Sequence, residues 1–279
     1  FLIEVGVPVY GSMGYADAMR LALDTTPQWG DDEGYGTQGT KPLVRNLARR
    51  YYLNHRVWIN HPDCFYLGAP DEPGRWRGQQ LKLNEARTYA TLVALNGGIT
   101  KIGNRFFDLN AQQLDILRRV LPVYDGAARP VDLFENQYPL VWDLGVAAGG
   151  MDWHAVGVFN WGRNRNWGKV VDEGPLTVTV RGGDLGLDPA ADYLAWAFWS
   201  EKFVGEFKGS GSVNMPLEPR TEDVLAIHKK TGAPQFLSTN RHVTQGGTDI
   251  AASKWDGSTN TLEITQNIAA GFDYKLTIY

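Results

Sequence analysis

The stretch 42–64, PLVRNLARRYYLNHRVWINHPDC, places a helix, a short strand and a group of polar side chains in immediate succession. Proline suits the first turn of a helix, because the amide hydrogen that it lacks would have no partner there. Leu43, Leu47 and Tyr51 recur at intervals of four residues and give the predicted helix one apolar face. The strand VWI follows and runs directly into NHPDC, so we expect these polar side chains at the carboxyl end of a strand.

The same alternation of strand and helix continues on both sides of that stretch, over residues 1–125. The predicted elements, in chain order, are a strand over 1–9, a helix over 12–20 with Ser12 as its N-cap, a helix from Asn84 to Gly97-Gly98, a short strand in ITKIG, and a helix from Asn110, with a capping box to Gln113, to Pro122. This alternation predicts a parallel α/β layout, in which active sites gather at the carboxyl ends of strands. Three or four such units are too few to close an eight-stranded barrel.

The pattern changes near residues 124–126, so we divide the chain into domains 1–125 and 126–279. Short runs with alternating apolar residues follow, separated by turn signals such as Asp256-Gly257. These runs are WHAVGVFNW (153–161), LTVTV (176–180), YLAWAFW (193–199), VLAIHKK (224–230), TLEITQN (261–267) and YKLTIY (274–279). They predict an antiparallel β-sandwich. The acidic segment 182–192, GGDLGLDPAAD, lacks the full calcium-loop pattern, and we expect a loop there.

The composition is that of a globular chain and excludes several classes of function. Of the 279 residues, 43% are hydrophobic and 21% are charged, with a net charge of −4, so nothing favours capture of nucleic acid or of an anionic membrane. No apolar run approaches the roughly 20 residues that cross a bilayer. A single cysteine, Cys64, excludes an internal disulfide and a cysteine-based zinc site. The single cysteine and the absence of an N-glycosylation acceptor together favour a cytoplasmic location for the protein.

Aromatic residues are unusually frequent, with 10 tryptophans and 12 tyrosines. Tryptophan and tyrosine combine an apolar ring with a polar group, which suits the CH faces and hydroxyl edges of sugars. An aromatic-rich β core explains the same composition equally well. His61 and His154 have no partners at metal-ligand spacing, so we expect no metal and no cofactor.

Three stretches, 5–29, 45–67 and 83–99, resemble the carboxyl-terminal half of the α-galactosidase (melibiase) family of retaining glycoside hydrolases, which is related to the raffinose synthases. The family pattern G-x-x-D-x-M-R-x-x-x-D-x-x-P-x-W is matched by Gly14, Asp17, Met19, Arg20, Asp24, Pro27 and Trp29, and its W-x-N-D-P-D-C by Trp58, Asn60, Pro62, Asp63 and Cys64. The tail from residue 234 resembles the sandwich that follows the barrel in this family. The resemblance therefore covers nearly the full chain.

The resemblance implies an α/β fold, the carboxyl-terminal half of a (β/α)8 TIM barrel over 1–125, followed by an antiparallel β-sandwich domain. Two carboxylates about 5–5.5 Å apart would flank the anomeric carbon. By motif position, Asp24 would be the general acid/base, and Arg20 would hold sugar hydroxyls. The alternative for Asp24 is an ordinary surface ion pair at the end of a short helix, and the alternative for Arg20 is a helix salt bridge with Asp17 or Asp24.

The resemblance gives further residues a place near the substrate. Asp63 would support the site or bind a sugar hydroxyl, and its alternative is to cap the following turn. Trp29 and Trp58 would wall the site, and their alternative is the protein core. Gly6 would lie near the 2-position of the sugar, where Val5-Gly6 replaces the usual Cys-Gly of the family. This replacement leaves the choice between a 2-hydroxyl and a 2-acetamido group open.

Two departures from the family pattern concern the catalytic groups. The K-x-D motif that carries the nucleophile is not found before Phe1, and Lys254-Trp255-Asp256 falls in a predicted hairpin. We therefore expect an amino-terminal portion of the same protein to supply the nucleophile and the other half of the barrel. His61 stands where the family has the first aspartate of N-D-P-D.

These features predict a hydrolase that removes terminal α-galactosides from an oligosaccharide or glycoside. Two enzymatic alternatives stay open, a transglycosylase and an α-N-acetylgalactosaminidase of the same superfamily. A third alternative is a non-catalytic carbohydrate-binding remnant. Homo-oligomer formation also stays open.

Overall fold

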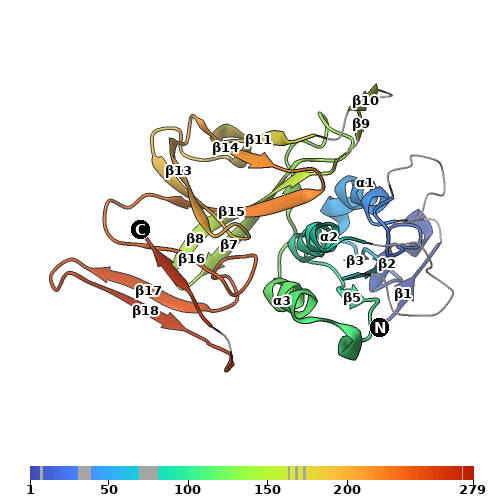
Figure 1. The fold of residues 1–279 in the computed structure, drawn as a ribbon, viewed down its shortest axis with the longest axis horizontal. Helices are drawn as coiled ribbons and strands as arrows, with labels where there is room; N and C mark the ends of the chain where they lie inside the picture. Colours follow the sequence, from blue (N-terminus) through green and yellow to red (C-terminus); the bar gives the residue numbers. More distant parts are fainter. Residues whose placement is uncertain are drawn as a thin grey trace.

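The computed structural model describes residues 1–6, 9–30, 39–68, 81–162, 164–166, 169–171, 174–271 and 273–279. A part with helices and short parallel strands lies beside a strand-rich part (Figure 1). The predicted strand over 1–9 includes residues 7 and 8, which lie outside the described residues. Its described portion is a strand only at β1 (Ile3–Glu4).

The first part is built from parallel strands and the helices that follow them. Its helices are α1 (Lys41–Arg50), α2 (Leu83–Asn96) and α3 (Ala111–Val120), with single turns at η1 (Val9–Ser12), η2 (Tyr51–Leu53) and η3 (Phe106–Asp108). Strands β1, β2 (Ala18–Arg20) and β3 (Ile59–His61) form one parallel sheet, and β4 (Cys64–Phe65) pairs in parallel with β5 (Lys101–Ile102). The predicted parallel pairing is confirmed.

Local signals in the sequence set the helix ends. At the start of α3, the amide of Gln113 donates to Asn110 Oδ1 at 3.0 Å, and the amide of Asn110 donates to Gln113 Oε1 at 2.9 Å. This is the predicted capping box. Helix α2 ends at Gly97, whose φ of 64° lies in the left-handed region that favours glycine.

The predicted helix over 12–20 is wrong. Residues 18–20 form strand β2, which hydrogen-bonds to β1 on one side and to β3 on the other. Gly14, with a φ of 84°, interrupts any helix that starts at Ser12. Ala18 and Met19 are almost fully buried, so pairing with strands from distant parts of the chain decides their conformation. Strand β3 also lies two residues later than the predicted VWI.

The second part is dominated by a six-stranded antiparallel sheet with the order β13-β12-β15-β8-β7-β6. Its strands are β6 (Arg129–Pro130), β7 (Val141–Ala148), β8 (Met151–Asn160), β12 (Asp192–Ala197), β13 (Lys202–Lys208) and β15 (Thr221–Lys229). Antiparallel pairs are formed by β9 (Asn164–Asn166) with β10 (Lys169–Val171), β11 (Leu176–Arg181) with β14 (Ser212–Leu217), β16 (Phe236–Thr239) with β19 (Leu276–Ile278), and β17 (Ile250–Asp256) with β18 (Thr261–Gln266).

Strands β11 and β14 cover one face of the large sheet in a sandwich-like arrangement. Their residues alternate between buried and exposed, and Val178, Val180 and Met215 form an apolar cluster with Val156 and Leu225 of the large sheet. The predicted loop over 182–192 is wrong at its start, where Gly182–Leu185 form the one-turn helix α4.

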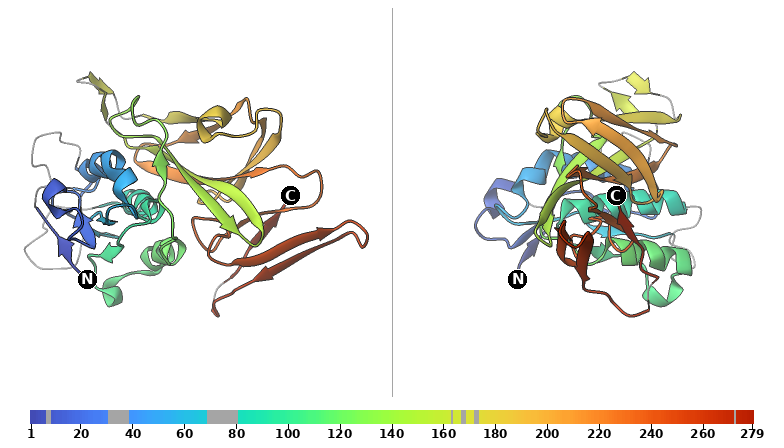
Figure 2. Two further views of the ribbon diagram at one scale, coloured as in Figure 1. Left: turned by 180° about the vertical axis from the view of Figure 1, so that it is seen from behind. Right: turned by 90° about the vertical axis from the view of Figure 1, so that its left-hand side faces the viewer.

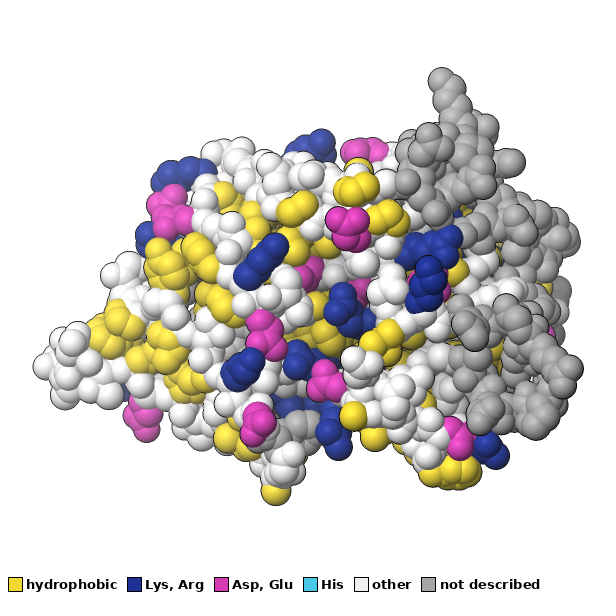
Figure 3. Space-filling view, viewed as in Figure 1, with side chains coloured by type: hydrophobic (Ala, Val, Ile, Leu, Met, Phe, Trp, Pro, Cys, Tyr) yellow, Lys and Arg dark blue, Asp and Glu magenta, His cyan; other side chains and the backbone are white. Residues whose placement is uncertain are grey.

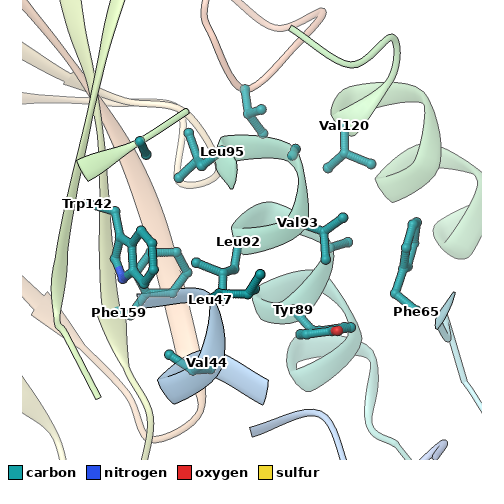
Figure 4. Close-up of a cluster of buried hydrophobic side chains, with 14 of the residues drawn as sticks. Val44, Leu47, Phe65, Tyr89, Leu92, Val93, Leu95, Val120, Trp142 and Phe159 are labelled. Carbon is teal, nitrogen blue, oxygen red and sulfur yellow. The ribbon is translucent and has the colours of Figure 1, made fainter. Parts of the chain in front are cut away.

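Helix α2 lies between the parallel strands and the other face of the large sheet (Figure 2). Figure 4 shows Leu92 and Leu95 of α2 directed toward Trp142 and Phe159 of that sheet. Gly157 of β8 allows this approach, because a Cβ there would collide with Leu95 Cδ1 and lie 2.8 Å from Phe159 Cε2. The two parts therefore share one apolar core.

The described surface mixes both signs of charge. On the face in Figure 3, basic and acidic side chains are interspersed among apolar ones. None of the helices in the described residues is both long and apolar enough to span a membrane.

Candidate active site

Strands β2 and β3 bring the two sequence motifs to one edge of the parallel sheet. The register pairs Arg20 with His61, the last residues of their strands, and the amide of Leu21 donates to His61 O at 3.0 Å. Asp24 follows β2 and Asp63 follows β3. Parallel strands therefore place both carboxylates beyond their carboxyl ends. This was predicted for Asp63 after VWI, whereas the strand before Asp24 is β2, which lies in the segment predicted as a helix.

Arg20 lies at the centre of this cluster. Its Nη2 donates to Asp24 Oδ1, its Nη1 lies 3.9 Å from Asp63 Oδ1, and its Nε donates to Ala22 O at 3.0 Å. The side chain of Arg20 is 18% exposed and that of Asp24 is 66% exposed. An ion pair between Arg20 and Asp24 does form, but it joins a strand end to a loop and not two turns of a helix.

The carboxylate of Asp63 faces inward and holds the loop that carries Asp24. Asp63 Oδ2 accepts from the amide of Thr25 at 2.9 Å, and Thr25 Oγ1 lies 3.3 Å from the same oxygen. The Thr25 hydroxyl also contacts Cys64 O as a donor. With a side chain only 12% exposed, Asp63 connects the segments after β2 and β3. Sequence reasoning missed Thr25, because its partners lie 38 and 39 residues away.

His61 is buried beside Asp63. Its Nδ1 accepts a hydrogen bond from the amide of Asp63 at 3.1 Å. Burial lowers the pKa of His61 below its ordinary value of 6.5, and the carboxylate of Asp63 opposes that effect. The cations Lys101 and Arg20 lower the pKa of His61 further. The imidazole is therefore neutral at pH 7.

Tyr89 of α2 also contacts this segment, and sequence reasoning missed it. Its hydroxyl donates to Pro62 O at 3.2 Å. Burial raises the pKa of Tyr89 well above its ordinary value, and Asp63 adds to that rise. Burial also raises the pKa of the Cys64 thiol, so both groups stay protonated at neutral pH.

The structure places Trp29 and Trp58 in the apolar core, each with 4% of its surface exposed. Trp29 stacks on Trp161 with ring centroids 6.2 Å apart, and its Nε1 donates to Trp161 O at 3.3 Å. Trp58 Nε1 donates to Asn60 Oδ1 at 3.1 Å. Neither indole offers an exposed ring face to a sugar, so the core alternative fits the structure better than a substrate wall.

Gly6 lies two residues beyond β1, at the same edge of the sheet as Arg20. Its φ of 72° lies in the left-handed region, and a Cβ built there would meet no atom within 4 Å. Backbone conformation therefore explains this glycine, and the space around it is open. Among the described residues, no group of three or more His, Cys, Asp or Glu side chains could hold a metal ion.

The sequence matches no protein-family model. Solved structures with a similar fold include α-galactosidase I from Mortierella vinacea, with a TM-score of 0.56 and 12% identity over 77% of this chain and 54% of that one. A GH27 β-L-arabinopyranosidase from Geobacillus stearothermophilus matches with a TM-score of 0.54 and 19% identity over 78% of this chain and 46% of that one. The α-galactosidase from Saccharomyces cerevisiae matches with a TM-score of 0.55 and 10% identity over 78% and 60%.

The chain thus spans about half the length of the chains that it matches. At these identities the likeness shows a shared fold. The resemblance inferred from the motifs is therefore confirmed at the level of the fold, which is that of α-galactosidases and related glycosidases.

Proposed function

We propose that this chain provides one half of the catalytic barrel, and a β-sandwich, of a retaining glycosidase that cleaves terminal α-galactosides. The observation that carries the proposal is the cluster of Arg20, Asp24 and Asp63 at the carboxyl ends of adjacent parallel strands. Active sites of parallel α/β folds gather at this edge. The proposal treats 1–125 as the carboxyl-terminal half of a (β/α)8 barrel and 126–279 as the sandwich domain.

Asp24 is the proposed general acid/base. Its exposed carboxyl group would donate a proton to the glycosidic oxygen as the bond to the leaving group breaks, and would later take a proton from the attacking water. Arg20 contacts both Asp24 and Asp63, so it orients the exposed carboxylate relative to the buried one. Asp63, which accepts from Thr25, is a supporting residue in this proposal.

A second carboxylate, the nucleophile, comes from an amino-terminal portion of the same protein in this proposal. The edges of the parallel strands support such a partner, because large apolar side chains beside them are exposed. Ile3 and Val5 at β1 are 41% and 51% exposed, and Phe107 after β5 is 82% exposed. Unpaired strand edges with apolar neighbours are sites where further strands add.

The test is Asp24→Asn in the complete enzyme, with turnover measured on a natural oligosaccharide and on an aryl α-galactoside that has a good leaving group. Loss of a general acid costs roughly 10²- to 10⁴-fold, and the loss is smaller when the leaving group needs no proton. Asp115→Asn is the matched control, because Asp115 lies on α3 and its Oδ2 forms an ion pair with Arg119 Nε at 3.0 Å. An unchanged rate of Asp24→Asn on the oligosaccharide would exclude the proposed role.

The same assay separates the alternatives. Transfer of the galactosyl group to an added sugar acceptor identifies a transglycosylase, and preference for 2-acetamido substrates identifies an α-N-acetylgalactosaminidase. If the protein binds these sugars but turns over none of them, it is a binding protein and the hydrolase proposal fails.

A further inference from the structure

The segment from His61 to Cys64 leaves β3 in an unusual backbone conformation. Asp63 has a φ of 70°, in the left-handed region that residues other than glycine, asparagine and aspartate rarely adopt. Several hydrogen bonds hold this segment. The amide of Asp63 donates to His61 Nδ1, the amide of Leu21 donates to His61 O, Tyr89 donates to Pro62 O, and Thr25 donates to Asp63 Oδ2 and to Cys64 O. The bond from the Asp63 amide is the one made within the segment itself.

That bond requires a particular state of the imidazole. Nδ1 accepts a hydrogen bond only when its lone pair is available, so the proton of the neutral ring lies on Nε2. A protonated ring would direct an N–H toward the N–H of Asp63, and the two donors would repel each other. The charged groups that face His61 are Asp63 from its own segment, Arg20 from β2 and Lys101 from β5.

The consequences reach Asp24 in two steps. The hydrogen bond from the backbone amide of Asp63 to His61 Nδ1 fixes the backbone of Asp63. Asp63 Oδ2 then accepts a hydrogen bond from the backbone amide of Thr25 at 2.9 Å. Thr25 is the residue next to Asp24, so its amide sets the start of the loop after Asp24. We propose that His61 is a positioning residue, whose neutral imidazole holds Asp63 and, through Asp63, the backbone that carries Asp24.

This inference rests on the proposed function for the importance of Asp24, but not for the hydrogen bonds themselves. It also gives the site an acid limit. Because burial lowers the pKa of His61, the hydrogen bond persists above the ordinary value of 6.5 and is lost as the pH falls through the lower folded-state value. Below that value the segment after β3 loosens.

Two substitutions distinguish the role of His61 as a hydrogen-bond acceptor from the effect of its protonation. In His61→Asn the amide oxygen occupies the place of Nδ1 and accepts from Asp63 without titrating. In His61→Gln the amide lies one bond further out, at the place of Nε2, and cannot make the same contact. His154→Asn is the matched control, because that histidine pairs with Asp143 on the large sheet, away from the site.

The measurement is amide hydrogen exchange at Thr25 and Asp63 in the full protein, corrected for intrinsic rates, from pH 8 down to the lowest pH at which the protein stays folded. At pH 7.5 the wild type, His61→Asn and His154→Asn should exchange slowly. His61→Gln should exchange roughly tenfold faster, as expected for the loss of one buried hydrogen bond. Protection in the wild type should fall on the acid side, and protection in His61→Asn should not.

Imidazole nitrogen chemical shifts provide an independent readout and should show the proton of His61 on Nε2. A proton on Nδ1, or equal exchange in His61→Gln and the wild type, would overturn the inference. In the complete enzyme, kcat should fall in His61→Gln and recover in His61→Asn, with KM little changed. If exchange behaves as expected while Asp24→Asn stays fully active, the positioning contact stands and the proposed function fails.

Discussion

Replacing Glu222 by glutamine should remove a pH-dependent loss of folding free energy at the contact between α2 and the large sheet. The Glu222 side chain is 0% exposed, and burial raises the pKa of its carboxyl group from 4.5 to about 7. Arg87 Nε donates to Glu222 Oε1 at 2.7 Å, and Thr88 Oγ1 donates to Oε2. These contacts favour the carboxylate, but the loss of hydration outweighs them.

The sign follows from proton binding. Between pH 4.5 and about 7 the folded chain keeps a proton on Glu222 that the unfolded chain releases. Stability therefore falls as the pH rises through this window. Each unit of pKa is worth about 1.4 kcal/mol, so a rise from 4.5 to about 7 corresponds to about 3 kcal/mol of folding free energy. This cost is absent below pH 4.5 and complete above pH 7.

Glutamine keeps the shape of glutamate and does not titrate. Its oxygen can accept from Arg87, and the Thr88 hydroxyl can rotate to accept from its amide. The variant should match the wild type near pH 4.5 and exceed its stability by about 3 kcal/mol at pH 8. Urea unfolding followed by tryptophan fluorescence at several pH values measures the difference.

Glu206→Gln is the matched control, because Glu206 is 36% exposed and pairs with Lys230 at the surface. It should change the pH dependence little. The measured quantity is the stability of Glu222→Gln minus that of the wild type, since other groups contribute equally to both proteins. If this difference is constant from pH 4.5 to pH 8, Glu222 ionises without cost and the reasoning is wrong.

Three further predictions concern stability and can be checked by the same unfolding measurement. Burial lowers the pKa of His228 from 6.5 to about 3, so the wild type should lose stability as the pH falls below 6.5. His228→Phe should lose less stability over the same range. Parallel curves of stability against pH for the two proteins would contradict this prediction. Gly157→Val should lower the free energy of unfolding by about 1–3 kcal/mol, because its side chain collides with Leu95. Gly145→Val is the control and should change that free energy little, because a Cβ there meets no atom within 4 Å. Similar losses in the two variants would contradict the packing of α2 against Gly157. Asn110→Ala should cost about 1 kcal/mol, because it removes the cap of α3, and a neutral result would mean that the capping box is not needed.

The elements with strong local signals could be predicted from the sequence. Helices α1 and α3 begin near Pro42 and Asn110, where a proline or a capping residue precedes an apolar face, whereas α2 begins at Leu83 with Lys82, not Asn84, at its N-cap. The helix predicted over 12–20 failed because β2 is only three residues long. Its hydrogen bonds come from strands near residues 3 and 59, and no local pattern records such partners.

The candidate site follows the same division. Asp63 could be predicted at a strand end, because it directly follows the VWI strand. Arg20 and Asp24 were brought to the same site by the family motif, since residues 12–20 were predicted as a helix and β2 at 18–20 was not foreseen. Thr25 and Tyr89 could not be predicted, because their roles depend on contacts across 38 and 27 residues. The candidate catalytic side chains are visible in motifs, whereas the side chains that hold them are visible only in the folded structure.

Helix α2 shows why the composition change near residue 125 does not divide the core. A surface helix has one apolar face, but α2 is buried along nearly all of its length from Glu85 to Asn96. Tyr89 faces the segment after β3, while Leu92 and Leu95 pack against the large sheet. The ion pair between Arg87 and Glu222 joins the same two parts. The strands that carry the candidate site are therefore supported by the strand-rich part through α2, in addition to the contact of Trp29 with Trp161.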